Sequence, residues 1–244
     1  HGFGGRLVTT PYVNDCEDPS ALLALARREK ARLIYFANPD NPMGSWWDAA
    51  TVQRMIDDTP DGALLMLDEA YSEFGPAGTL PPLDVTNPKL LRFRTFSKAY
   101  GLAAERVGWV TGAAHLVDLV NRLRGAFNVS VSAQKAALAA LSDQAFVAAS
   151  REHNAAERAR FLDAIAALGN HGIAACPSEA NFVLVRFTGS VSASQALEAL
   201  GEAGYAVRHL PSQGLPDALR ITIGKTGDMT RVIATLRTLC GEAA

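Results

Sequence analysis

The sequence has few cysteines: three among 244 residues, far apart at Cys16, Cys176 and Cys240. An odd number without metal-ligand spacing argues against a disulfide scaffold and suits a reducing compartment, so we expect a cytoplasmic protein. The five histidines show no ligand spacing either, and no metal site is predicted.

Long apolar runs and a surplus of positive charge are also missing. No run approaches the roughly 18 to 20 residues that cross a bilayer, so no membrane association is expected. Lysine and arginine are scattered and the formal net charge is −2. Because no basic stripe is left to neutralise phosphates, nucleic acid is not an expected partner.

An initiating methionine is absent as well. The chain opens on His1 and soon enters Arg6-Leu7-Val8-Thr9, which indicates a strand already under way. We therefore expect that an N-terminal part is missing.

Short apolar runs alternate with longer segments of helical period in the first part of the chain. This alternation is typical of an α/β fold with a mostly parallel sheet. The predicted strands cover residues 33–36, 63–67, 90–93 and 107–110, and the predicted helices cover residues 19–28, 48–57 and 113–124.

After about residue 142 the pattern changes to that of a smaller α+β domain. We therefore expect one domain over residues 1–142 and a second over residues 143–244. The second is predicted to contain helices over 143–168, 192–203 and from 228 onward, with strands over 181–187 and 219–223.

Polar residues stand where several of the predicted strands stop, and in open α/β sheets such strand ends form the ligand crevice. Two Asn-Pro pairs, at Asn38 and Asn41, predict an irregular turn after the first strand. Asp68 follows the second strand, with Tyr71 three residues later. Taken alone, the first pattern is also that of an ordinary turn, and Asp68 fits equally the metal-holding acid of a P-loop ATPase.

The loop after the third strand is more specific. Lys98 is preceded by Ser97, followed by Gly101 and answered eight residues later by Arg106. A lone lysine in a loop is usually a solvated surface charge, but this combination is a far more specific signal.

Together the residues match three motifs, N-P-x-N-P-x-G, D-E-A-Y and S-K-x-x-G-x-x-x-x-R-x-G. With them the sequence resembles the class I/II, fold type I, pyridoxal-phosphate-dependent aminotransferases over nearly all its length. Within that family it resembles the histidinol-phosphate aminotransferase branch most closely. The resemblance implies a large domain with helices on both faces of a mostly parallel sheet, N-terminally incomplete here, and a smaller C-terminal α+β domain. It also implies a homodimer.

The resemblance implies three catalytic residues. Lys98 holds pyridoxal 5'-phosphate as a Schiff base and then moves the proton of the substrate's α-carbon. Asp68 faces the pyridine nitrogen and keeps it protonated, and Tyr71 hydrogen-bonds the ring's phenolate oxygen.

Four further positions are implied to bind. Asn41 joins Tyr71 at the phenolate oxygen, while Ser97 and Arg106 take the phosphate. Arg220, in an otherwise apolar run, binds the substrate's α-carboxylate, although an edge-strand arginine facing solvent also fits that pattern.

The resemblance implies ping-pong transamination between an amino donor, histidinol phosphate or a related amino acid, and 2-oxoglutarate, as in amino-acid biosynthesis. A lyase such as a threonine-phosphate decarboxylase is an alternative on the same scaffold, and an ATP-binding module round Asp68 is another. The family's upstream arm, glycine-containing phosphate loop and ring-stacking residue are absent from the 244 residues, so a catalytically inert fragment is a further alternative. Met43 and Glu105 depart from residues usual in the family.

Overall fold

The computed structural model describes residues 4–242. They divide into two compact units, residues 4–40 with 46–142, and residues 41–45 with 143–242. The short segment Asn41–Ser45 therefore belongs to the second unit, although the residues on either side of it belong to the first.

The first unit contains a four-stranded sheet with the strand order β1-β2-β3-β4. β1 (Leu33–Ala37), β2 (Leu64–Asp68) and β3 (Leu90–Thr95) run parallel, and β4 (Gly108–Gly112) is antiparallel to β3. All four strands lie where the apolar runs predicted them. The prediction of an α/β fold with a mostly parallel sheet is confirmed.

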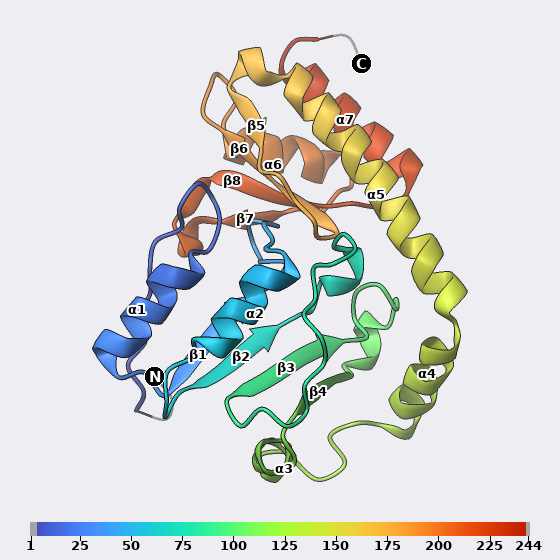
Figure 1. The fold of residues 1–244 in the computed structure, drawn as a ribbon. Helices are drawn as coiled ribbons and strands as arrows, with labels where there is room; N and C mark the ends of the chain where they lie inside the picture. Colours follow the sequence, from blue (N-terminus) through green and yellow to red (C-terminus); the bar gives the residue numbers. More distant parts are fainter. Residues whose placement is uncertain (1–3, 243–244) are drawn as a thin grey trace. The chain divides into compact units, whose positions relative to one another are not determined.

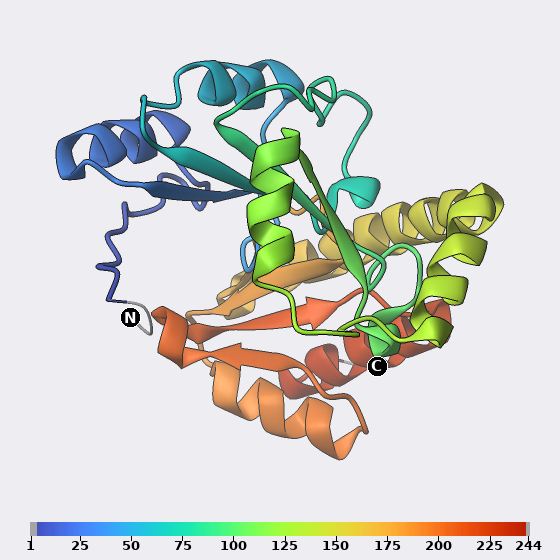
Figure 2. The same ribbon diagram turned by 90° about the horizontal axis from the view of Figure 1, so that it is seen from below.

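Helices cover both faces of this sheet because successive strand side chains point to opposite faces. On one face α1 (Pro19–Glu29) and α2 (Ala49–Asp57) pack on a core that includes Phe36. On the other face α3 (Ala114–Arg122) packs on Leu91 and its neighbours. Figures 1 and 2 show these layers from two sides.

Aspartates set the start of the first two helices. The carboxylate of Asp18 accepts a hydrogen bond from the backbone of Ala21 at 3.0 Å, and Pro19 occupies the first helical turn. Asp48 accepts from the backbone of Thr51 at 2.7 Å. Such caps satisfy amide groups that have no partner inside the helix, which explains why the predicted helix starts were nearly correct.

Two features of the first unit differ from the sequence prediction. Arg6–Thr9 is not a strand, since residues 5–12 have no regular secondary structure. A strand forms only where another strand pairs with its backbone, and among residues 4–242 none pairs with this segment. The helix α4 (Val131–Ser142) was not predicted, because its many alanines show little periodic contrast.

The second unit contains an antiparallel sheet with the strand order β5-β6-β8-β7. The two longer strands coincide with predicted strands, whereas the two three-residue strands are too short for a sequence pattern to reveal. The strands are β5 (Ile173–Ala175), β6 (Phe182–Phe187), β7 (Arg208–Leu210) and β8 (Leu215–Thr222).

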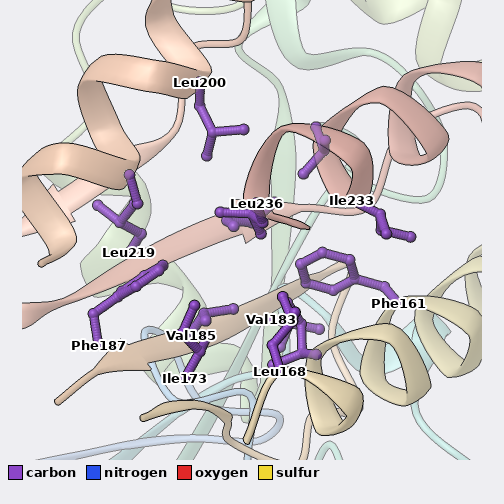
Figure 3. Close-up of a cluster of buried hydrophobic side chains, with 14 of the residues drawn as sticks. Phe161, Leu168, Ile173, Val183, Val185, Phe187, Leu200, Leu219, Ile233 and Leu236 are labelled. Carbon is purple, nitrogen blue, oxygen red and sulfur yellow. The ribbon is translucent and has the colours of Figure 1, made fainter. Parts of the chain in front are cut away.

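Three helices, α5 (Gln144–Ala167), α6 (Ala193–Glu202) and α7 (Thr226–Leu239), pack on this sheet. Figure 3 shows how their side chains meet those of the strands, with Phe161 and Leu236 fully buried between them. The α+β character predicted for this part of the chain is confirmed.

Short 3-10 turns lie at η1 (Ser72–Phe74), η2 (Ala103–Glu105), η3 (Gly169–His171) and η4 (Pro211–Gln213).

Within residues 4–242, each helix is too short or too polar to span a bilayer.

Candidate active site

The carboxyl ends of β2 and β3 bring the chemistry-bearing residues of the first unit to one edge of its sheet. Asp68 is the last residue of β2 and lies opposite Phe93 of β3 in the parallel ladder. Lys98 follows three residues after the end of β3. Because the two strands are parallel, both residues leave the sheet at the same edge, where ligands of such sheets bind.

The carboxylate of Asp68 is held at both oxygens. One oxygen accepts a hydrogen bond from the backbone amide of Ala70 at 2.9 Å, and the other accepts from the phenol of Tyr35 at 2.7 Å. These donors fix the orientation of a half-buried carboxylate. The sequence did not predict Tyr35 as part of the site.

Lys98 lies beside Tyr71. Its ammonium is 4.9 Å from the centre of the Tyr71 ring, and Tyr71 itself is buried. Lys98 is half-buried, so the amine is not a freely solvated surface charge. The structure thus brings together the amine and the phenol that the motifs singled out.

The loop that carries Lys98 is shaped by a turn and an aromatic cluster. The backbone amide of Gly101 donates to the carbonyl of Lys98 at 2.9 Å, and Gly101 has a φ of +72°, which glycine adopts readily. The rings of Phe96 and Trp109 lie 4.7 Å apart, and the Tyr100 ring lies 5.0 Å from that of Phe96. This packing positions the loop between β3 and β4.

Ser97 and Arg106 form an exposed pair of donors at the same loop. The guanidinium of Arg106 donates to the Ser97 hydroxyl at 3.2 Å and to the carbonyl of Ala103 at 2.7 Å. Two residues after Arg106 the backbone leaves no room for a side chain, because a Cβ at Gly108 would lie 2.5 Å from the carbonyl oxygen of Arg94. A fixed arginine beside a hydroxyl is suited to bind a phosphate group.

The remaining two predicted residues, Asn41 and Arg220, meet in the second unit. The guanidinium of Arg220, on β8, donates a hydrogen bond to the side-chain oxygen of Asn41. It also lies over the ring of Phe182, with 4.8 Å between the guanidinium carbon and the ring centre. Arg220 is half-buried, and its strand β8 lies between β6 and β7 rather than at the edge of the sheet.

Acidic and phenolic groups that the sequence did not single out lie near Asp68. Tyr12 donates to Asp40 at 3.1 Å, and Glu17 accepts from the backbone of Ala37 at 3.3 Å. Burial, reinforced by the charges of Asp40 and Asp68, raises the pKa of Glu17 to about 8. Burial also raises the pKa of the Tyr35 phenol, and its hydrogen bond to Asp68 adds to the effect.

The place of Tyr35 at the site follows from strand register and not from a motif. The parallel register pairs Ala37 with Asp68, and Tyr35 points to the same face as Ala37 two residues earlier. No cluster of three or more His, Cys, Asp or Glu side chains suited to a metal ion occurs within residues 4–242.

Proteins with similar sequences and a solved structure with a similar fold are known. The chain is 49% identical over 241 residues to a histidinol-phosphate aminotransferase from Erythrobacter litoralis, covering 96% of this chain and 64% of that protein. It is 44% identical to a histidinol-phosphate aminotransferase from Zymomonas mobilis, covering 93% and 62%. The chain thus spans less than two thirds of the length of these curated relatives.

A solved structure shares the fold. The histidinol-phosphate aminotransferase from Sinorhizobium meliloti, crystallised in complex with pyridoxal-5'-phosphate, superposes with a TM-score of 0.87 at 38% sequence identity. The match covers 98% of this chain and 65% of that one. The fold class predicted from the sequence, fold type I, is therefore confirmed. The sequence model of one family, aminotransferase class I and II, matches residues 3–236, and the chain belongs to that family.

Proposed function

We propose that the full-length protein is a pyridoxal-phosphate-dependent aminotransferase. Its proposed amino donor is histidinol phosphate or a related amino acid, its acceptor is 2-oxoglutarate, and the reaction is ping-pong. The names of the relatives and the cofactor in the Sinorhizobium meliloti structure support the proposal. Residues 1–142 are proposed as the cofactor-binding large domain and 143–244 as the small domain.

One observation carries the proposal: the amine of Lys98 lies beside the Tyr71 ring on a loop in which Arg106 donates a hydrogen bond to Ser97. A phosphorylated pyridine aldehyde needs an amine for its aldehyde, donors for its phosphate and a carboxylate for its ring nitrogen. Asp68 supplies the carboxylate at the same sheet edge. The residues present therefore fit the cofactor.

Pyridoxal phosphate supplies an aldehyde that bonds to amines and a protonated ring that draws electrons from the substrate's α-carbon. Lys98 would bond to the aldehyde and, once released by substrate, take the α-proton on its Nζ atom. Asp68 would accept the ring N–H and Tyr71 would donate to the ring's phenolate oxygen. Ser97 and Arg106 would hold the phosphate.

Arg220 is proposed to bind the α-carboxylate of the substrate. A planar guanidinium presents two parallel N–H donors to a carboxylate, and the guanidinium of Arg220 packs over the Phe182 ring. Asn41 accepts from Arg220 through its oxygen, which leaves its amide NH₂ as the end that would donate to the cofactor's phenolate oxygen.

We also propose a homodimer in the cytoplasm that acts on small amino and keto acids. Apolar side chains exposed at and between α3 and α4 support the dimer, because monomers rarely leave such groups in water. Leu123 is 88% exposed and Phe127 98%, and Val131 and Leu138 are also well exposed. The free cysteines support a reducing compartment.

Borohydride trapping tests the cofactor attachment. The full-length protein is incubated with pyridoxal phosphate, reduced, digested and analysed by mass spectrometry. The cofactor mass is expected on the peptide that contains Lys98, and a Lys98→Ala variant should lose it while a Lys89→Ala variant keeps it. Labelling spread over surface lysines, or full activity in Lys98→Ala, would contradict the proposal.

A donor panel tests the reaction. Histidinol phosphate and common amino acids are each supplied with 2-oxoglutarate, and glutamate and carbon dioxide are both measured. Glutamate formed with histidinol phosphate is the expected result. Carbon dioxide without glutamate would indicate the decarboxylase alternative, and the absence of both products would indicate an inert protein.

A further inference from the structure

Three carboxylates and two phenols gather around the ends of β1 and β2 in the first unit. Tyr12 donates to Asp40, and Tyr35 donates to Asp68, each phenol engaging one carboxylate. Glu17 lies among them, since its pKa responds to the charges of both aspartates. Three acids so close together repel one another when ionised, and the two phenols donate hydrogen bonds that hold two of the carboxylates in place.

Tyr35 reaches Asp68 because of the strand register. β1 and β2 pair in parallel with Ala37 opposite Asp68, so Tyr35 lies on the same face one pleat earlier. Its hydroxyl engages the oxygen of Asp68 that the backbone of Ala70 does not hold. With one donor on each oxygen, rotation of the carboxylate about its last bond is restricted. Each oxygen still keeps a lone pair for a further donor.

Glu17 adds a third acid to this group. Burial, reinforced by the charges of Asp40 and Asp68, raises its pKa to about 8, so Glu17 carries a proton at neutral pH. The phenol of Tyr35 donates to the Asp68 carboxylate at 2.7 Å and holds it in one orientation beside this acid.

We propose that Tyr35 is a positioning residue that aims the Asp68 carboxylate at the ring nitrogen of the cofactor. The inference rests on the proposed function. Tyr35 acts through Asp68 alone, and its effect therefore exists only for a ligand whose ring carries the nitrogen.

The solvent exposure of Tyr35 bounds the size of the effect. Tyr35 is 57% exposed and, with Tyr12 and Glu17, lines a cavity of about 560 Å³. Water can replace part of the lost hydrogen bond when the hydroxyl is removed. The expected change in affinity is therefore about five- to tenfold, less than the loss of a fully buried charge-assisted bond.

Two cofactor ligands and two matched variants test the inference in the full-length protein. Dissociation constants are measured for pyridoxal phosphate and for its analogue with carbon in place of the ring nitrogen. Tyr35→Phe removes the hydroxyl that reaches Asp68, and Tyr12→Phe removes the equivalent hydroxyl that reaches Asp40. Binding of the carbon analogue also reports that the variant site is folded.

Tyr35→Phe is expected to raise the dissociation constant of pyridoxal phosphate about five- to tenfold and to change that of the carbon analogue by less than about twofold. Tyr12→Phe should change neither. If Tyr35→Phe weakens the binding of both ligands equally, Tyr35 has a structural role only. If it weakens the binding of neither, Tyr35 has no role at the site. Either result overturns the inference while the proposed function stands. Failure of the wild-type protein to bind pyridoxal phosphate would overturn the proposed function itself.

Discussion

Arg220 and Asn41 are 179 positions apart in the sequence, yet the guanidinium of Arg220 donates a hydrogen bond to the side-chain oxygen of Asn41. The bond lies within the second unit, to which the segment Asn41–Ser45 belongs. The arginine proposed for the substrate carboxylate is thereby oriented by the asparagine of the N-P-x-N-P-x-G motif.

Removing the guanidinium of Arg220 should weaken substrate binding. Arg220→Ala is expected to raise the KM for the amino donor about 100-fold, and Arg220→Lys less, because lysine cannot make the forked contact. Steady-state kinetics of the full-length protein provides the measurement. Arg186→Ala, in the neighbouring strand β6, is the control and should change KM less than about twofold. An unchanged KM in Arg220→Ala would refute the carboxylate role.

A side chain at Gly44 should destabilise the second unit. Gly44 has a φ of +79°, and a Cβ there would lie 2.2 Å from the hydroxyl oxygen of Ser178. Gly44→Ala is expected to reduce the free energy of unfolding by about 3 kcal/mol, from backbone strain together with the clash. Urea unfolding measures it. Gly62→Ala has a similar φ of +80° with open space around it, and should cost only about 1 kcal/mol. Equal losses in the two variants would mean that the contact with Ser178 is unimportant.

Glu69 should be a major contributor to the stability of the first unit. It is 1% exposed and pairs with Arg92 at 2.6 Å and Arg94 at 3.0 Å. Glu69→Ala leaves the buried Arg92 without its anion and Arg94 with Glu73 alone, at 3.4 Å, and is expected to cost about 3 to 5 kcal/mol, measured by denaturant unfolding. In contrast, Asp118→Ala breaks an exposed pair with Arg122 and should cost under about 1 kcal/mol. A small loss in Glu69→Ala would show that the arginines find other partners.

Glu17 should make stability fall as pH rises. Its pKa is raised from 4.5 to about 8 in the folded protein, so between these values the folded state holds a proton that the unfolded state has released. The free energy of unfolding therefore decreases with rising pH across this window, by at most about 1.4 kcal/mol per pH unit.

Glu17→Gln is expected to flatten this decrease, because glutamine has no proton to lose. Thermal or urea unfolding at pH 5, 6.5 and 8 measures the slope, with Glu202→Gln as a control that removes the same charge from an exposed position. An identical slope in wild type and Glu17→Gln would rule out the buried acid as its source.

The sequence located most of the sheet and the helices because the local signals were strong. Buried parallel strands are continuous apolar runs, and aspartates mark the helix starts. The short strands β5 and β7 and the helix α4 carry little periodic contrast and were missed. The segment Arg6–Thr9 is apolar enough for a strand, but pairing depends on a neighbour and not on the segment itself.

Some residues of the candidate site could be predicted from the sequence and others could not. Motifs singled out Lys98 and Tyr71, and the structure places the amine next to the ring, while their chemical roles remain predictions. Tyr35 could not be identified from a motif, because its contact with Asp68 depends on the register of two strands. The bond between Asn41 and Arg220 depends on tertiary folding in the same sense.

The membership of Asn41–Ser45 in the second unit has a consequence for how that unit folds during synthesis. Met43 is 1% exposed and packs inside the second unit against Cys176, Leu184 and Leu210. During translation Met43 leaves the ribosome before those residues have been synthesised. The second unit is therefore not encoded by one continuous stretch of the gene. A gene fragment that starts at Asp143 would produce a polypeptide lacking this methionine, and its interior would stay open until a peptide carrying residues 41–45 was added back.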